Sequence, residues 1–202
     1  MPQPYKGGFI GGPNVMREHP ALAAEIGNIA SNWSWVEHSL MMLYGLLMGT
    51  YLPRPSGLPA DGTQWGAPIH PVAHQIFDGL QTLNVRLDLL TRLVKWCAEP
   101  SEAEHFEKVL VKKIRKVAKA RNEILHGLWY RALATDELGD GEPIDIPDVL
   151  ILKSTFGPSL QYKLADFEDI SARILGVRRE LSAFTHPISN RISQKLNEPS
   201  KS

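Results

Sequence analysis

Hydrophobic residues between positions 20 and 49 recur at spacings of three and four, as they do along one face of a long amphipathic helix. The same spacing predicts a second helix over about 71–97, a third over about 101–129 and a fourth over about 166–184. The segments between them carry Pro and Gly, which interrupt a helical pattern. The chain is therefore expected to be mainly α, with its helices packed as an antiparallel bundle.

After the third helix the pattern shortens to that of β-strands. Segments 128–134, 149–155 and 160–164 are rich in aromatic and branched residues, which favours short strands. They predict a small β-hairpin or three-stranded antiparallel appendage after the third helix.

The chain has the size of one ordinary domain, because 202 residues with 43% hydrophobic content can bury a single core. We predict one helical domain over residues 20–186, a flexible lead-in over residues 1–19 and a C-terminal tail over residues 187–202. Residues 50–68, rich in Pro and Gly, and residues 136–148, which are acidic, are expected to be surface loops of unassigned role.

Charge and cysteine content restrict which cellular compartment and which kinds of partner are expected. Lys and Arg total 22, as do Asp and Glu, so a nucleic-acid partner has to be met by a local basic patch. The single Cys97 cannot form an internal disulfide, which favours the cytoplasm. The N-terminal residues lack the apolar core of a signal peptide, and the longest apolar run, 40–47, is too short to span a bilayer. No membrane partner is expected.

The candidate chemistry lies near the end of the third helix, in the run Arg121-Asn122-Glu123-Ile124-Leu125-His126-Gly127. The helix is expected to start with a capping box over residues 101–104. Arg121 falls on the apolar stripe of the helix, where a leucine is the ordinary choice.

An Arg and a His separated by four to six residues form a weak pattern, because about one match is expected by chance in a chain of this composition. Arg179 and His186 form such a second match. The first match differs in its context, since polar Asn122 follows Arg121 directly, Gly127 closes the run and the helix before it is strongly basic.

This combination resembles the HEPN family (higher eukaryotes and prokaryotes nucleotide-binding domains). The family signature is an Arg, a polar residue, three variable residues and a His, late in a helical bundle. The stretch Trp33-Ser34-Trp35-Val36-Glu37 is similar to an aromatic-and-Glu stretch common in the family. The resemblance covers about 20–184 and implies metal-independent RNA cleavage in a cleft between two protomers, in the role of a toxin or defence effector.

The residue types suit that reaction, in which a ribose 2′-hydroxyl loses a proton as it attacks phosphorus and the leaving 5′-oxygen gains one. His126 can act as base or acid, because histidine ordinarily titrates near neutral pH. Arg121 offers a permanently charged fork of donors to the phosphate oxygens. Asn122, one turn before His126, can orient the imidazole or bind phosphate. Neither a metal ligand nor a cofactor is required.

The helical spacing predicts a homodimer. Arg121 and His126 are five positions apart, about 140° around a helix, so they do not share a face. In a dimer with a twofold axis, the Arg121 and His126 pairs of the two protomers could come together in one groove. Five basic residues of the same helix are expected to bind the RNA backbone, although a solvated face is the ordinary alternative: Lys112, Lys113, Arg115, Lys116 and Lys119.

Two alternatives stay open. Arg121 can be a buried structural partner of Glu37, with His126 as a helix-terminal residue favoured by the helix dipole. A HEPN-like module that binds RNA, nucleotide or a protein partner without cleaving shares every feature above, and an antitoxin or a nucleotidyltransferase is the protein partner considered.

Other candidate residues are assigned to structure. His70 and His74 have the spacing of a zinc pair, but no third ligand is suggested nearby, so no metal site is expected. Aromatic residues at helical spacing usually fill a core, and this is the expectation for four tryptophans: Trp33, Trp35, Trp96 and Trp129.

Overall fold

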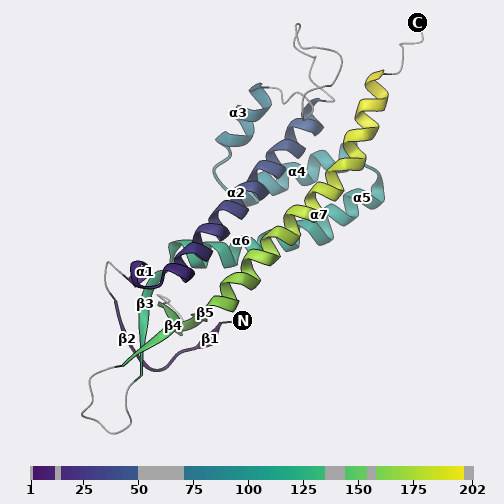
Figure 1. Cartoon of the computed structure of the whole chain (residues 1–202). Coiled ribbons are helices and arrows are strands. Elements are labelled where there is room, and N and C mark those ends of the chain that lie inside the picture. Colours follow the sequence, from purple (N-terminus) through teal and green to yellow (C-terminus); the bar gives the residue numbers. More distant parts are fainter. Residues whose placement is uncertain (1, 12–14, 50–70, 135–143, 154–157, 198–202) are drawn as a thin grey trace, which may run out of the picture. The chain divides into compact units, whose positions relative to one another are not determined.

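The computed structural model of the chain describes residues 2–11, 15–49, 71–134, 144–153 and 158–197. Within these residues the protein is mainly helical and carries one small antiparallel sheet (Figure 1). The predicted class, a helical fold with a β appendage after the motif helix, is confirmed.

The helices lie close to the predicted positions. α2 (Pro20–Gly49) coincides with the first predicted helix, and Pro20 suits its first turn because the N–H that proline lacks would be unpaired there. The other helices are α1 (Val15–Glu18), α3 (Pro71–Gly79), α4 (Leu83–Cys97), α5 (Pro100–His105), α6 (Val111–His126) and α7 (Leu164–Asn197), with a π-helical turn at Phe106–Leu110. Among the described residues, no helix combines the length and the apolar character that crossing a membrane requires.

The second predicted helix is interrupted between α3 and α4. The Thr82 hydroxyl caps α4 by accepting a hydrogen bond from the backbone N–H of Val85 at 3.3 Å. In α3, Phe77 is buried whereas Val72 and Ile76 are about half exposed.

The capping box that starts α5 is centred on Glu99 and not on Ser101. The Glu99 side chain accepts from the backbone N–H of Glu102, and the Glu102 carboxylate accepts from the backbone N–H of Glu99 at 3.0 Å. Pro100 occupies the first helical position, which places Ser101 inside the helix.

The last helix continues beyond the predicted stop at Pro187. A proline within a helix removes one backbone hydrogen bond, yet the following turns are held by other contacts. Ile188 is buried, and the Arg191 guanidinium forms a forked ion pair with Glu102, with 2.8 Å between Nη1 and Oε1. Residues 187–197, expected in a polar tail, are therefore helical.

The sheet has five antiparallel strands in the order β1-β5-β4-β3-β2. The three strands predicted after the motif helix are β3 (Leu128–Ala134), β4 (Ile144–Lys153) and β5 (Leu160–Lys163). β4 begins inside the segment predicted as the acidic loop 136–148, while residues 50–68 lie outside the described residues.

The two edge strands come from the segment predicted as a flexible lead-in over residues 1–19. β1 (Gln3–Pro4) pairs with β5, and β2 (Gly8–Ile10) pairs with β3. Tyr5 and Phe9 pack on a small cluster of buried sheet residues, and a side chain at Gly11 would overlap the ring of Tyr130. The glycines here allow close approach of aromatic rings, which the composition alone does not distinguish from disorder.

The chain divides into two compact units, and the prediction of one helical domain over residues 20–186 stays a prediction. Unit 1 comprises Met1–Trp33 and Lys116–Leu175, and unit 2 comprises Ser34–Arg115 and Gly176–Ser202. The core of unit 1 includes the buried residues Leu22, Ile29, Trp33, Ile124, Phe167, Ile170 and Ile174.

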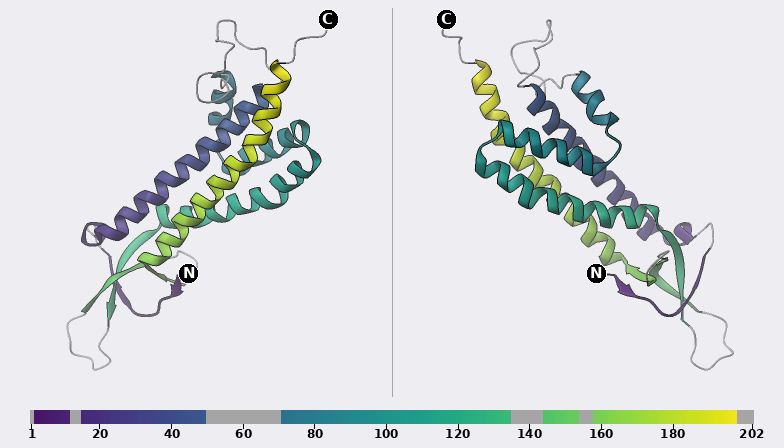
Figure 2. Two further views of the ribbon diagram at one scale, coloured as in Figure 1. Left: turned by 45° about the vertical axis from the view of Figure 1, so that its right-hand side comes forward. Right: turned by 180° about the vertical axis from the view of Figure 1, so that it is seen from behind.

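Unit 2 buries residues of α2, α3, α4, the π-helical turn and α7. α4 and α5 contact each other across their short connection (Figure 2). The rings of Phe106 and Phe184 pack in a tilted arrangement with 5.2 Å between their centroids. Of the tryptophans expected in a core, Trp35 and Trp96 belong to this unit and are 49% and 79% exposed, so that prediction is wrong for both.

Candidate functional site

The predicted motif occupies the last two turns of α6, and Trp129 of unit 1 holds this end of the helix in place. The Trp129 Nε1–H donates to the Ile124 carbonyl at 3.1 Å. Its ring lies 5.3 Å from that of Tyr162 and 5.4 Å from that of Phe167, measured between centroids. Trp129, at the start of β3, therefore links the end of the motif helix to β5 and to α7 through these contacts.

A cavity of about 490 Å³ opens beside this last turn. Its polar wall consists of three α6 residues, Asn122, Glu123 and His126, followed by Gly127. Its apolar wall comes from the β4–β5 hairpin and consists of Leu152, Pro158 and Leu160. Asn122 and His126 thus line one cavity, as residues one helical turn apart should.

Gly127 packs tightly between the two walls. A Cβ atom at this position would lie 2.7 Å from the backbone oxygen of Glu123 and would overlap the side chain of Leu152. The absence of a side chain therefore lets the hairpin approach the helix end and sets the width of the cavity at this point.

Arg121 lies away from the cavity. Its guanidinium carbon is 6.0 Å from the centre of the Trp33 ring, and its Nη1–H donates to the Oδ1 of Asn122 at 2.8 Å. Its Nε is buried and has no hydrogen-bond partner among the described residues. Within one protomer Arg121 and His126 therefore do not converge, in agreement with their helical spacing.

The Asn122 side chain accepts a hydrogen bond from Arg121 and lines the cavity together with His126. Its Oδ1 accepts from Arg121, and its Nδ2–H₂ group is a donor on a residue that lines the cavity. Glu37, the predicted structural partner of Arg121, belongs to unit 2 and Arg121 to unit 1, so that pairing stays a prediction.

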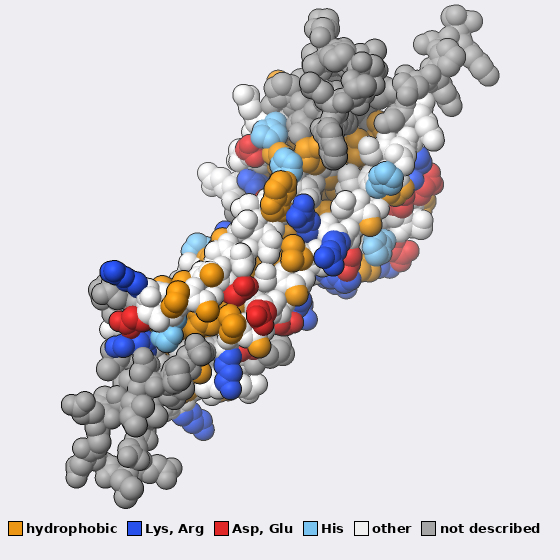
Figure 3. All heavy atoms as spheres, viewed as in Figure 1, with side chains coloured by type: hydrophobic (Ala, Val, Ile, Leu, Met, Phe, Trp, Pro, Cys, Tyr) orange, Lys and Arg blue, Asp and Glu red, His pale blue; other side chains and the backbone are white. Residues whose placement is uncertain are grey.

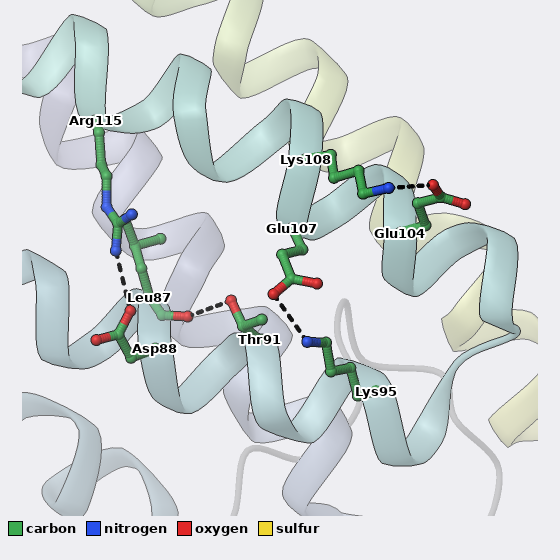
Figure 4. Close-up of polar contacts among 8 residues, drawn as sticks. All are labelled: Leu87, Asp88, Thr91, Lys95, Glu104, Glu107, Lys108 and Arg115. Carbon is green, nitrogen blue, oxygen red and sulfur yellow. Dashed lines mark hydrogen bonds and ion pairs between the residues drawn. The ribbon is translucent and has the colours of Figure 1, made fainter.

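Most of the basic residues predicted to bind RNA already face carboxylates. Lys113 contacts Glu180 at 2.7 Å, Arg115 contacts Asp88 at 3.0 Å and Lys119 lies 4.0 Å from Glu123. Figure 4 shows the Arg115–Asp88 pair, and on the surface drawn in Figure 3 side chains of both signs are interspersed.

Lys112 and Lys116 differ from these three residues. Both side chains are exposed, and neither makes an ion pair within the described part of the chain. They are one turn apart in α6, so they present positive charge on the same side of that helix.

Tyr162 of β5 packs against Trp129 and Phe167. Burial, with the negative charges of Glu123 and Asp166 as smaller causes, raises the pKa of Tyr162 to about 12. The phenol is therefore neutral at physiological pH and belongs to the aromatic cluster with Trp129, and not to the titrating groups.

No metal centre is built from the described residues. His74 pairs with Asp78 at 3.2 Å, while His70 lies outside the described residues. Among the described side chains there is no group of three or more His, Cys, Asp or Glu residues that could hold an ion.

Sequence reasoning missed four of the cavity residues. Glu123 occupies a variable position of the motif, where only its helical spacing from His126 indicates a shared face. Leu152, Pro158 and Leu160 carry no chemical signal, because their position depends on the pairing of β4 with β5.

The fold and the site together define a mainly helical protein with a cavity of mixed polarity between a helix end and a β-hairpin. Comparisons with protein-family models, with curated proteins and with solved structures yielded no match.

Proposed function

We propose that this protein is a metal-independent endoribonuclease that acts as a homodimer, with Arg121, Asn122 and His126 forming its catalytic site. The observation that carries the proposal is the shared cavity of Asn122 and His126 beside the hydrogen bond from Arg121 to Asn122. This arrangement places an acid–base group, an amide donor and a permanent positive charge within one and a half turns of α6.

Each group has a defined part in the reaction. His126 takes the proton of the ribose 2′-hydroxyl or delivers one to the leaving 5′-oxygen. Arg121 stabilises the negative charge that accumulates on the phosphoryl oxygens, and the Asn122 amide orients the phosphate or the imidazole. The products of this attack are a 2′,3′-cyclic phosphate and a 5′-hydroxyl.

The proposal requires two protomers because Arg121 and the cavity lie on different sides of α6. In a twofold dimer, Arg121 of one protomer would meet the His126 cavity of its partner. A monomer at assay concentration, measured by light scattering, would contradict this reading.

The basic residues of α6 are proposed to contact the RNA backbone. Lys112 and Lys116 are exposed and unpaired within the described chain, while Lys113, Arg115 and Lys119 face carboxylates that phosphate would have to displace. Such exposed pairs contribute only about 0–1 kcal/mol each, so their displacement is not a large barrier. A cytoplasmic toxin or defence effector is the role we infer.

The first experiment is cleavage of a labelled RNA of mixed sequence, in the presence of a chelator, by the wild type, by His126→Ala and by His186→Ala. His186 is a matched control, because it is an exposed histidine in the second Arg/His match and its side chain shares a hydrogen bond with exposed Asn190, 3.2 Å away. We expect cleavage by the wild type and by His186→Ala, with 2′,3′-cyclic phosphate ends, and at least a 100-fold loss in His126→Ala.

A second candidate function is a module that binds RNA, nucleotide or a protein partner such as an antitoxin without cleaving. It is favoured by the ion pairs that occupy three of the five predicted RNA-binding residues. A folded, dimeric wild type that binds RNA but cleaves none would establish this alternative and exclude the ribonuclease.

A further inference from the structure

The cavity beside His126 has two walls of different chemistry. Leu152, Pro158 and Leu160 form an apolar wall, while Glu123 and Asn122 present hydrogen-bonding groups from the helix. A ligand that fills such a space has a flat apolar body and a polar edge, which is the character of a nucleobase.

The polar wall offers hydrogen-bond acceptors and a hydrogen-bond donor. The Glu123 carboxylate has two acceptor oxygens, and its side chain is 45% exposed. Its one ion pair among the described residues is a long contact of 4.0 Å to Lys119. Asn122 has its oxygen occupied by Arg121, so its amide offers hydrogens.

We propose that this cavity is a base-binding subsite that selects guanine in an RNA substrate. The Watson–Crick edge of guanine carries two adjacent donors, N1–H and N2–H₂, which match the two oxygens of one carboxylate. Its O6 acceptor lies next to these donors and matches an amide hydrogen of Asn122. Adenine, cytosine and uracil each lack the pair of adjacent donors, so none of them satisfies the carboxylate fork.

The inference rests on the proposed function for its substrate, but its selectivity depends on Glu123, which has no part in the proposed catalytic site. Glu123 is the specificity-determining residue in this proposal. His126 lines the same cavity, so the scissile phosphate would lie next to the bound nucleotide. Cleavage is therefore expected on the 3′ side of guanosine.

The test uses guanosine 3′-monophosphate and the three other nucleoside 3′-monophosphates as probes, with binding to the full chain measured by calorimetry. The wild type is expected to bind the guanosine nucleotide at least tenfold more tightly than the others. Glu123→Gln should abolish this preference, because an amide replaces one acceptor by a donor. Glu107→Gln serves as a matched control, since Glu107 pairs with Lys95 in unit 2 and lies outside the cavity.

Equal binding of all four nucleotides, absence of binding by every one, or an unchanged preference in Glu123→Gln would each overturn the subsite. Sequencing the ends of RNA cleavage products separates the two proposals. Cleavage without a preference for guanosine leaves the ribonuclease intact and refutes the guanine subsite. Selective guanosine binding without any cleavage refutes the ribonuclease and leaves the subsite.

Discussion

Replacing Trp129 by Phe tests how the motif helix is fastened to the sheet. The substitution keeps an aromatic ring near Tyr162 and Phe167 but removes the Nε1–H that donates to the Ile124 carbonyl. A hydrogen bond of this kind contributes about 1 kcal/mol to the free energy of unfolding. Trp129→Leu also removes two aromatic pairs, each contributing about 0.5–1.5 kcal/mol, so its total cost should be about 2–4 kcal/mol.

The assay is urea unfolding followed by far-ultraviolet circular dichroism. With a urea dependence of about 2 kcal/mol per M, the Phe variant should lower the unfolding midpoint by about 0.5 M. Trp96→Phe is the matched control, because Trp96 is 79% exposed and its replacement should change stability by less than about 0.5 kcal/mol. Equal effects of the Trp96 and Trp129 substitutions would refute the reasoning.

Three other predictions concern the helix end, an ion pair and the dimer. Gly127→Ala should destabilise the protein by about 1–3 kcal/mol, whereas Gly176→Ala, with open space around its Cβ position, should stabilise it by up to about 1 kcal/mol, both measured by thermal unfolding. The hydrogen bond from the Arg191 guanidinium lowers the pKa of Glu102. Glu102→Gln keeps the capping acceptor but loses this ion pair, so it should lower the free energy of unfolding by about 1 kcal/mol at pH 7. The difference in stability between wild type and Glu102→Gln should disappear as pH falls below 4.5, the ordinary carboxyl pKa, because protonation of Glu102 then removes the ion pair from the wild type as well. A stability difference that does not change with pH would contradict this prediction. Mixing Arg121→Ala with His126→Ala protomers, with exchange verified by labelling, should restore about a quarter of the wild-type RNA cleavage, and no recovery would exclude a shared site.

The sequence predicted the elements whose positions follow from the local periodicity of hydrophobic residues. α2 and β3 coincide with the predicted segments, and the offset of Arg121 from His126 follows from helix geometry alone. These features needed no knowledge of distant contacts.

The errors arise where contacts between distant segments decide the structure. Pro187 was expected to end the last helix, but the burial of Ile188 and the pairing of Arg191 with Glu102 extend it. The exposure of Trp96 depends on which face of α4 packs inward, which its hydrophobic character does not reveal.

The same limit applies to the site. Helical spacing alone predicted that Asn122 and His126 lie on one face. The apolar wall with Leu152 and Leu160 could not be predicted in this way, because it depends on the register of β4 and β5. A cavity formed by two elements was therefore only half predictable from one of them.

The N-terminal residues support one wall of the cavity, because the edge strand β1 pairs with β5. Pro4 pairs with Leu160, and the Tyr5 N–H donates to the Ser159 carbonyl at 2.8 Å, next to Pro158. Trimming the first five residues would leave the outer side of β5 without these partners and loosen the segment that forms the apolar wall. An affinity tag intended for binding measurements is therefore better attached at the C-terminus than next to β1.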